Sequence, residues 1–424
     1  MKDQTIQIHG GYTTDSNSHA VVPPIYQTVA YEFDNAQYAA DLFNLVKPGN
    51  IYTRLMNPTA DVLEKRMAML EGGKAAVAVA SGQAAIEYAL LNLAKNGDNI
   101  VSVPQLYGGT LTLLTSVFAD LGIEGRLAKT DSAADIEALI DDRTRAVYCE
   151  TIGNPAGNIV DISALAEVAH RHGVPLVVDN TVASPVICKP ISFGADIVVH
   201  SLTKFCGGHG NTMGGIIVDS GKFDWKKYGD KYSQFTAPEK SYHGVVYCES
   251  FGDVAYAARI RTVFLRNTGA ILPPQSCFMI LVGLETLSLR MKQHVANTIA
   301  IAEYLKNHPK VAWVHSAHFP DNKYHELAVK YTKGSQSGLL TFGLKGGKDD
   351  GAKFYDALKL FKRVVNIGDS RSCVTHPAST THRQLNSDQL KAAGIGEELI
   401  RLTIGIEDPE DLIEDIEQAL AQIS

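Results

Sequence analysis

Five short apolar runs, each separated from the next by a stretch long enough to hold a helix, constrain the fold of this 424-residue chain. The runs are AAVAVAS (75–81), NIVSVP (99–104), AVYCE (146–150), PLVVDN (175–180) and DIVVHS (196–201). Strands that are apolar throughout, without polar alternation, are typical of sheets buried on both faces. The pattern therefore predicts an α/β fold with a mainly parallel sheet and helices on both faces.

The chain is long enough for two domains, because single cores stop growing at about 250–300 residues. Residues 1–56 are irregular and rich in proline turns, which predicts an arm that packs on a partner subunit. Residues 57–270 hold the five runs and form the predicted large domain. A helical pattern near 276–307 leads into a smaller C-terminal α/β domain, 271–424. It contains strand patterns LLTFGL and LIRLTIGI and the helix pattern DLIEDIEQALAQI.

Charge and targeting signals exclude several classes of function. The net charge is −7 and no Lys/Arg cluster occurs, which argues against nucleic-acid or membrane-surface partners. The N-terminus lacks the apolar core of a signal peptide, and no apolar run reaches membrane-spanning length, so we expect a cytoplasmic protein. Six cysteines lie far apart without a CxxC pair, which predicts buried, reduced thiols and no metal site.

Residues directly after the predicted strands are the candidates for a ligand site, because open α/β sheets bind ligands beyond the carboxyl ends of their strands. After the first strand, Ser81, Gly82 and Gln83 open a helix whose free N–H groups and dipole suit a phosphate. The later strand ends supply a ring, an amide, a carboxylate and an amine with two hydroxyls: Tyr107, Asn154, Asp179, and Lys204 with Ser201 and Thr203.

Each of these residues also has an ordinary structural interpretation when it is taken alone. Ser81 could be a helix cap, Tyr107 a packing side chain, Asp179 a turn cap and Lys204 a solvated charge. Together, however, they supply what pyridoxal phosphate requires: an amine, an acid for the pyridine nitrogen, a phosphate cradle and a stacking ring. A dinucleotide-binding oxidoreductase is disfavoured, because no GxGxxG follows the first strand.

Six motifs resemble those of the Cys/Met-metabolism pyridoxal-phosphate enzymes, and the resemblance runs essentially end to end. They are YTRLMNPT (52–59), SGQAA (81–85), ETIGNP (150–155), VVDNT (177–181), SLTK (201–204) and HPASTTH (376–382). The resemblance implies an aspartate-aminotransferase-like fold (fold type I) and a homotetramer built from two intimate dimers, with active sites shared across the dimer interface.

The resemblance also implies roles for residues around the cofactor ring. Lys204 matches the lysine that links to the cofactor as a Schiff base, and Asp179 the acid that keeps the pyridine nitrogen protonated. Tyr107 matches the stacking tyrosine and a catalytic phenol, and Asn154 the amide near the phenolic oxygen. The cofactor phosphate is expected to contact Ser81, Gly82, Gln83, Ser201 and Thr203.

Three further positions carry expected contacts to the substrate or to a second subunit. Tyr52 and Arg54 match a pair that reaches the phosphate of the neighbouring subunit, and Tyr52 is also expected near the substrate. Arg401 matches the arginine that binds the α-carboxylate of the amino acid, a bidentate task that suits guanidinium. Asn366 occupies a substrate-side position that is often serine in the lyases of the family.

Within the family, SYHGVVY (241–247), the extra length around 221–270 and HPASTTHRQL (376–385) look most like the branch that transfers sulfide to O-acetylhomoserine. The implied reaction is γ-replacement, giving homocysteine and acetate, or methionine with a thiol. Methionine γ-lyase and cystathionine γ-synthase activities are the alternatives, and a noncatalytic cofactor-binding protein is an alternative of another class. Gln83 stands where many relatives have methionine, and a backbone N–H contact would tolerate either residue. Cys206, Cys373 and Thr375 replace commonly apolar residues, which affects the expected pocket shape.

Overall fold

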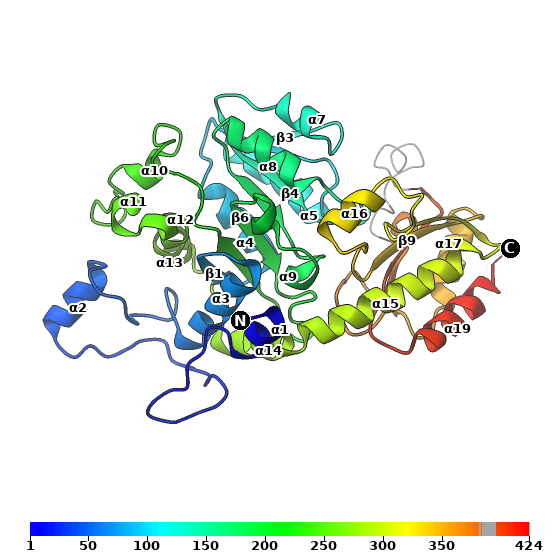
Figure 1. The fold of residues 1–424 in the computed structure, drawn as a ribbon, viewed down its shortest axis with the longest axis horizontal. Helices are drawn as coiled ribbons and strands as arrows, with labels where there is room; N and C mark the ends of the chain where they lie inside the picture. The colour runs from blue at the N-terminus through cyan, green and yellow to red at the C-terminus, as the bar shows by residue number, and fades with distance from the viewer. Residues whose placement is uncertain (381–382, 384–395, 424) are drawn as a thin grey trace.

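Two β-sheets organise the chain in this computed structural model, which describes residues 1–380, 383 and 396–423. The strand order is β1-β7-β6-β5-β4-β2-β3 in the larger sheet and β10-β11-β12-β9-β8 in the smaller one. Helix α15 (Leu287–Lys306) runs from beneath the first sheet to the second (Figure 1). The end of the predicted motif 376–385, at residues 381–382 and 384–385, lies outside the described residues.

All five apolar runs form strands of the larger sheet, as the sequence predicts. The seven strands are β1 (Ala75–Val79), β2 (Asn99–Ser102), β3 (Glu124–Leu127), β4 (Thr144–Glu150), β5 (Leu176–Asp179), β6 (Ile197–Ser201) and β7 (Gly215–Asp219). Only β7 is antiparallel to its neighbours within this sheet, where it separates β1 from β6. The carboxyl ends of the other six strands therefore point to one edge.

The prediction omitted β3 and β7. β3 is a half-exposed strand at the end of the sheet with the sequence EGRL, which has little apolar character. β7 directly follows a glycine-rich stretch, 207–214, which the sequence alone indicates as a loop. Neither omission changes the fold class, because the parallel strands β2, β3, β4, β5 and β6 still dominate the sheet.

Helices pack against the larger sheet and begin at residues that suit helix starts. Asn57 caps α3, with Pro58 as its first residue, and Asp161 caps α8. The helices of this part are α1 (Asp3–His9), α2 (Ala36–Phe43), α3 (Pro58–Glu71), α4 (Gly82–Leu91), α5 (Gly108–Thr112), α6 (Phe118–Asp120), α7 (Ala133–Glu137), α8 (Ile162–Arg171), α9 (Ser184–Ile187), α10 (Ser233–Thr236), α11 (Tyr247–Ser250), α12 (Ala255–Arg259), α13 (Arg266–Thr268) and α14 (Pro274–Glu285).

The smaller sheet has its own apolar core, which includes Phe342, Phe354 and Ile416. Its strands are β8 (Val311–His315), β9 (Leu339–Leu344), β10 (Lys362–Arg363), β11 (Cys373–Thr375) and β12 (Leu399–Thr403). With α15, the helices α16 (His325–Tyr331), α17 (Lys348–Ala357) and α19 (Pro409–Leu420) complete this part. The helical pattern predicted near 276–307 is two helices, since the chain leaves helical geometry at Thr286.

The N-terminal arm contains two short helices that the sequence did not indicate. Helix α1 packs against α3 and α14, and Arg66 of α3 donates hydrogen bonds to the carbonyls of Gln7 and Gly10. Helix α2 lies at the end of the arm, away from both sheets (Figure 1). The division of the chain at residues 56 and 270 stays a prediction.

Two expectations about the whole chain can be compared with the structure. All six cysteines are buried, and none forms a disulfide. Within the described residues, no helix combines the length and the apolar character needed to cross a membrane.

Candidate active site

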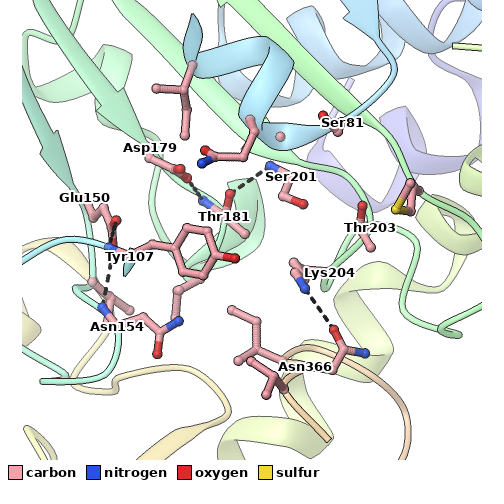
Figure 2. Close-up of a pocket in the computed structure, with 18 of the residues that line it drawn as sticks. Ser81, Tyr107, Glu150, Asn154, Asp179, Thr181, Ser201, Thr203, Lys204 and Asn366 are labelled. Carbon is pink, nitrogen blue, oxygen red and sulfur yellow. Dashed lines mark hydrogen bonds between the residues drawn. The ribbon is translucent and has the colours of Figure 1, made fainter. Parts of the chain in front are cut away.

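The carboxyl ends of β1, β4, β5 and β6 surround a cavity of about 240 Å³ that also reaches the smaller sheet (Figure 2). Eleven of the thirteen predicted site residues line it: Ser81, Gly82, Gln83, Tyr107, Asn154, Asp179, Ser201, Thr203, Lys204, Asn366 and Arg401. Arg401 belongs to β12 of the smaller sheet, and Asn366 lies in the loop between β10 and β11. The structure thus places residues from both sheets around one cavity.

Lys204 lies in the turn after β6 and points into the cavity (Figure 2). Its Nζ donates a hydrogen bond to Oδ1 of Asn366 at 2.9 Å. Burial, and then the positive charge of nearby Arg401, lower the pKa of the Lys204 ammonium. A larger fraction of this amine is therefore neutral at physiological pH than for an ordinary lysine, which a nucleophilic or basic role requires.

Asp179, the last residue of β5, presents a carboxylate to the same cavity. Its Oδ1 accepts the Thr181 N–H at 2.9 Å, and the Tyr148 phenol donates to Oδ2 at 3.4 Å. Burial raises the pKa of Asp179. Among the described residues no ion pair includes Asp179, so this buried carboxylate is suited to pair with a protonated ring nitrogen.

The start of α4 forms a cradle of backbone N–H groups beside β6. The Ser81 hydroxyl accepts the Ala84 N–H at 3.1 Å, while the N–H groups of Gly82 and Gln83 have no partner within the helix. A Cβ atom on Gly82 would lie 2.6 Å from Cβ of Ser201, so only glycine allows this approach. The arrangement suits a phosphate, which would meet free N–H groups at the positive end of the helix dipole.

Glu150 is a site residue that the sequence analysis missed. It ends β4, it is 4% exposed, and it lines the cavity. Its Oε1 accepts the Tyr107 N–H at 2.6 Å and its Oε2 accepts the Asn154 N–H at 3.3 Å (Figure 2). The signal was present, because the strand-end rule that selected Asp179 applies equally to the last residue of AVYCE.

Arg401, in the middle of β12, is a buried guanidinium with neutral partners. Its Nη1 donates to Oδ1 of Asn154 at 3.0 Å, and its Nη2 donates to Oγ1 of Thr375 at 3.0 Å and to the Asn366 carbonyl at 3.3 Å. Its Nε has no partner, and no ion pair within the described chain includes it. Burial lowers the pKa of this guanidinium. An uncompensated buried cation of this kind favours a bound anion.

Tyr52 and Arg54 do not line this cavity. The Arg54 guanidinium carbon lies 5.2 Å from the centre of the Tyr52 ring, and Tyr52 is 38% exposed. The two side chains share one side of the arm. Their predicted target, the phosphate site of a neighbouring subunit, stays a prediction.

Comparison with known proteins identifies the family. The model of the Cys/Met metabolism PLP-dependent enzymes matches residues 4–421. The chain belongs to this family. It is 48% identical to a protein named homocysteine synthase from Schizosaccharomyces pombe, across 98% of this chain and 97% of that protein. It is 46% identical to O-acetyl-L-homoserine sulfhydrylase 1 from Thermus thermophilus, across 99% of this chain and all of that protein.

A solved relative shares the fold over its whole length. The crystal structure of a Campylobacter jejuni protein, described as an O-acetylhomoserine (thiol)-lyase, matches with a TM-score of 0.94 and 40% identity. It covers 99% of this chain and 100% of that chain, and it carries a pyridoxyl-lysine phosphate adduct. The predicted fold class and the predicted cofactor are thereby confirmed, and the chain is a pyridoxal-phosphate-dependent enzyme of fold type I.

The cavity residues fit this cofactor. The cradle at Gly82, which a side chain would fill, matches the phosphate. The buried carboxylate of Asp179 matches the ring nitrogen, and the amine of Lys204, whose pKa is lowered, matches the aldehyde. Cys206 and Cys373 are buried but are not among the cavity-lining residues, whereas Thr375 contacts Arg401 directly.

Proposed function

We propose that this enzyme catalyses γ-replacement on O-acetyl-L-homoserine, in which sulfide displaces acetate to give L-homocysteine. The observation that carries the proposal is the pairing of Lys204 and Arg401 in one cavity. A buried amine of lowered pKa faces the space next to a buried guanidinium without an acidic partner. The names of the fungal and bacterial relatives, homocysteine synthase and O-acetyl-L-homoserine sulfhydrylase, support the choice of substrates.

In the proposed site, groups at the ends of five strands would hold the cofactor. The Gly82 and Gln83 N–H groups with the Ser81, Ser201 and Thr203 side chains would bind its phosphate, and Asp179 would pair with its ring nitrogen. Asn154 would contact its phenolic oxygen, and Tyr107 would stack on its ring. When bound, pyridoxal phosphate supplies an electron-accepting ring that stabilises negative charge at the substrate's α- and β-carbons.

The chain's own residues then bind the substrate and move protons. Arg401 binds the α-carboxylate, which fixes the α-carbon close to Lys204. The neutral Lys204 amine takes the proton from the α-carbon, and this transfer is effectively intramolecular because both groups are held in one cavity. Asn366, which already accepts a hydrogen bond from Lys204, orients that amine. Loss of a proton from the β-carbon then expels acetate from the γ-carbon, and Tyr107 donates a proton to the departing acetate. Sulfide adds at the γ-carbon, and protons return to the β- and α-carbons to give homocysteine.

The charges around the cavity favour sulfide over cysteine as the acceptor. Among the described residues that line it, the cations are Lys204 and Arg401, and both have proposed tasks in the first half of the reaction. The apolar side chains Met213 and Val365, which are 66% and 63% exposed, lie at its open side. A second amino acid would need a cation for its own carboxylate, whereas sulfide or a small alkyl thiol would not.

We also propose a cytoplasmic homotetramer in which Tyr52 and Arg54 of one subunit complete the phosphate site of another. Two observations support this arrangement. The pair is held together on the arm but lies outside the chain's own cavity. Six buried cysteines without a disulfide agree with a reducing compartment.

The test uses purified protein supplied with pyridoxal phosphate. O-Acetyl-L-homoserine is given with and without sulfide, O-succinyl-L-homoserine is compared as donor, and L-methionine is given alone. Homocysteine, 2-oxobutanoate and methanethiol are measured. We expect homocysteine that depends on both O-acetylhomoserine and sulfide. Dominant release of methanethiol from methionine would instead identify a γ-lyase, and bound cofactor without any turnover would identify a binding protein.

A further inference from the structure

Thr375 is the neighbour of Arg401 across two antiparallel strands. The last residue of β11, Thr375, pairs in register with Arg401 of β12, so their side chains share one face of the smaller sheet. Thr375 is 4% exposed. Its Oγ1 accepts a hydrogen bond from Nη2 of Arg401 at 3.0 Å, and its own hydroxyl points to the Val364 carbonyl at 3.5 Å.

The three oxygens that hold Arg401 are all uncharged. Besides Thr375, they are Oδ1 of Asn154 and the carbonyl of Asn366. A buried arginine is normally held by a carboxylate, because a charge pair offsets the cost of desolvation. Here the contacts fix the plane of the guanidinium without cancelling its charge. The charge therefore remains available to an anion that enters the cavity.

We propose that Thr375 is a positioning residue for substrate recognition: its hydroxyl orients Arg401 with a neutral acceptor, so that the guanidinium keeps its full charge for the α-carboxylate. An apolar residue of the same shape would leave Nη2 with the Asn366 carbonyl alone. An acidic residue would occupy the guanidinium in place of the substrate. Serine would preserve the contact. The inference rests on the proposed role of Arg401 and adds the residue that sets its orientation.

The test compares two unreactive ligands that differ by one group. L-Norvaline has no leaving group, and n-butylamine is norvaline without its carboxylate. Binding of each to the cofactor-loaded enzyme is followed by the change in cofactor absorbance, for wild type, Thr375→Val, Thr375→Ser and Thr375→Asp. Because Thr375→Val removes a hydrogen bond to the charged guanidinium of Arg401, we expect this variant to bind norvaline about tenfold more weakly. Butylamine affinity should be unchanged.

The conservative and acidic variants separate positioning from a structural role. Thr375→Ser should restore norvaline binding to within about twofold, since it keeps the acceptor. Thr375→Asp should weaken norvaline more than Thr375→Val does, because it pairs with the guanidinium. In turnover assays with O-acetylhomoserine, Thr375→Val should raise KM with little change in kcat, because carboxylate binding is present in both ground and transition states.

Different failures lead to different conclusions. Equal affinity of wild type and Thr375→Val for norvaline would overturn the proposal for Thr375. Equal loss of norvaline and butylamine binding in Thr375→Val would also overturn it, because it would show general damage to the site. Failure of wild type to turn over O-acetylhomoserine would reject the proposed reaction but not the role of Thr375, which the binding comparison measures independently of turnover.

Discussion

Glu150 and Asp179 are register partners at the carboxyl ends of the adjacent parallel strands β4 and β5, and both carboxylates line the cavity. Burial, and then the negative charge of Asp179, raise the pKa of Glu150 well above its usual range. Its two oxygens accept the N–H groups of Tyr107 and Asn154, which come from different loops. The carboxylate of Glu150 thus connects the ring and the amide of the site.

The first prediction concerns this connection. Both oxygens of the Glu150 carboxyl group accept a backbone N–H. In glutamine an NH2 group replaces one of these oxygens, so an N–H donor would face the N–H of Tyr107 or Asn154. We expect Glu150→Gln to lower kcat/KM by about 10- to 100-fold, because Tyr107 or Asn154 loses its fixed position. Steady-state kinetics of the cofactor-loaded enzyme measure this effect. Glu167→Gln, on an exposed position of α8, is the control and should change nothing. Wild-type kinetics in Glu150→Gln would contradict the prediction.

The second prediction concerns the cofactor's attachment point. Borohydride reduction of the cofactor-loaded enzyme should leave a pyridoxyl group on the peptide that contains Lys204, as determined by mass spectrometry. Lys204→Ala should give no such adduct, because no other amine lines the cavity among the described residues. Lys226→Ala, at an exposed position, should behave like wild type. An adduct that maps to any other lysine of the wild-type enzyme would refute the assignment.

The third prediction concerns the charge of Arg401. This charge, together with the larger effect of burial, lowers the pKa of Lys204. The neutral amine reacts with the cofactor aldehyde, so the rate at which apoenzyme takes up pyridoxal phosphate should rise with pH as Lys204 loses its proton. Arg401→Gln removes a positive charge, so the pKa of Lys204 should increase and the rise should move to higher pH. Stopped-flow absorbance between pH 6 and about 10 covers this range.

Arg371→Gln, an exposed arginine paired with Asp369, provides the matched control for that experiment. Its pH profile should overlay that of wild type. A shift of the Arg401→Gln profile to lower pH would show that the loss of the guanidinium acts through another route, such as greater access of water to the amine.

The fourth prediction concerns the approach of α4 to β6. A methyl group on Gly82 would lie 2.6 Å from Cβ of Ser201, so one of the two elements must move. We expect Gly82→Ala to cost about 1–3 kcal/mol of stability through overpacking. Its dissociation constant for pyridoxal phosphate should also increase. Gly347→Ala is the control, because a Cβ there meets nothing within 4 Å. Unchanged cofactor affinity in Gly82→Ala would argue against the phosphate cradle.

The fifth prediction concerns the pH dependence of stability. Burial raises the pKa of Asp219, at the end of β7, from 3.8 to about 7. The folded state therefore disfavours the ionised carboxylate, and wild type loses stability as pH rises from about 4 through 7. Asparagine does not titrate, so the melting temperature of Asp219→Asn relative to wild type should increase between pH 5 and 8. The change in relative stability should be about 2–3 kcal/mol.

The exposed Asp34 supplies the comparison for that measurement. Asp34→Asn should show the same pH dependence as wild type. A constant difference in melting temperature between Asp219→Asn and wild type at every pH would mean that Asp219 has an ordinary pKa in the folded protein.

The sequence by itself determined five of the seven strands of the larger sheet and most of its functional edge. Strands that are apolar throughout are typical of a sheet buried on both faces. Parallel strands place their carboxyl ends at the same edge of that sheet. Lys204, Asp179 and the helix start at Ser81 therefore meet for local reasons: each lies at or just beyond the end of a strand with a clear apolar pattern. Glu150 also lies at the end of a strand, so the same rule could have predicted it, although the prediction did not include it.

Only the tertiary structure decided which distant residues complete the cavity and how they are held. Arg401 lies in another sheet, 197 positions after Lys204 in the sequence. Residue types alone do not show that Thr375, Asn366 and Asn154 all accept hydrogen bonds from its guanidinium. Such contacts depend on how one sheet packs against the edge of another, which is set by the sum of many long-range apolar contacts. A local hydrophobic pattern specifies the elements, but it does not specify that packing.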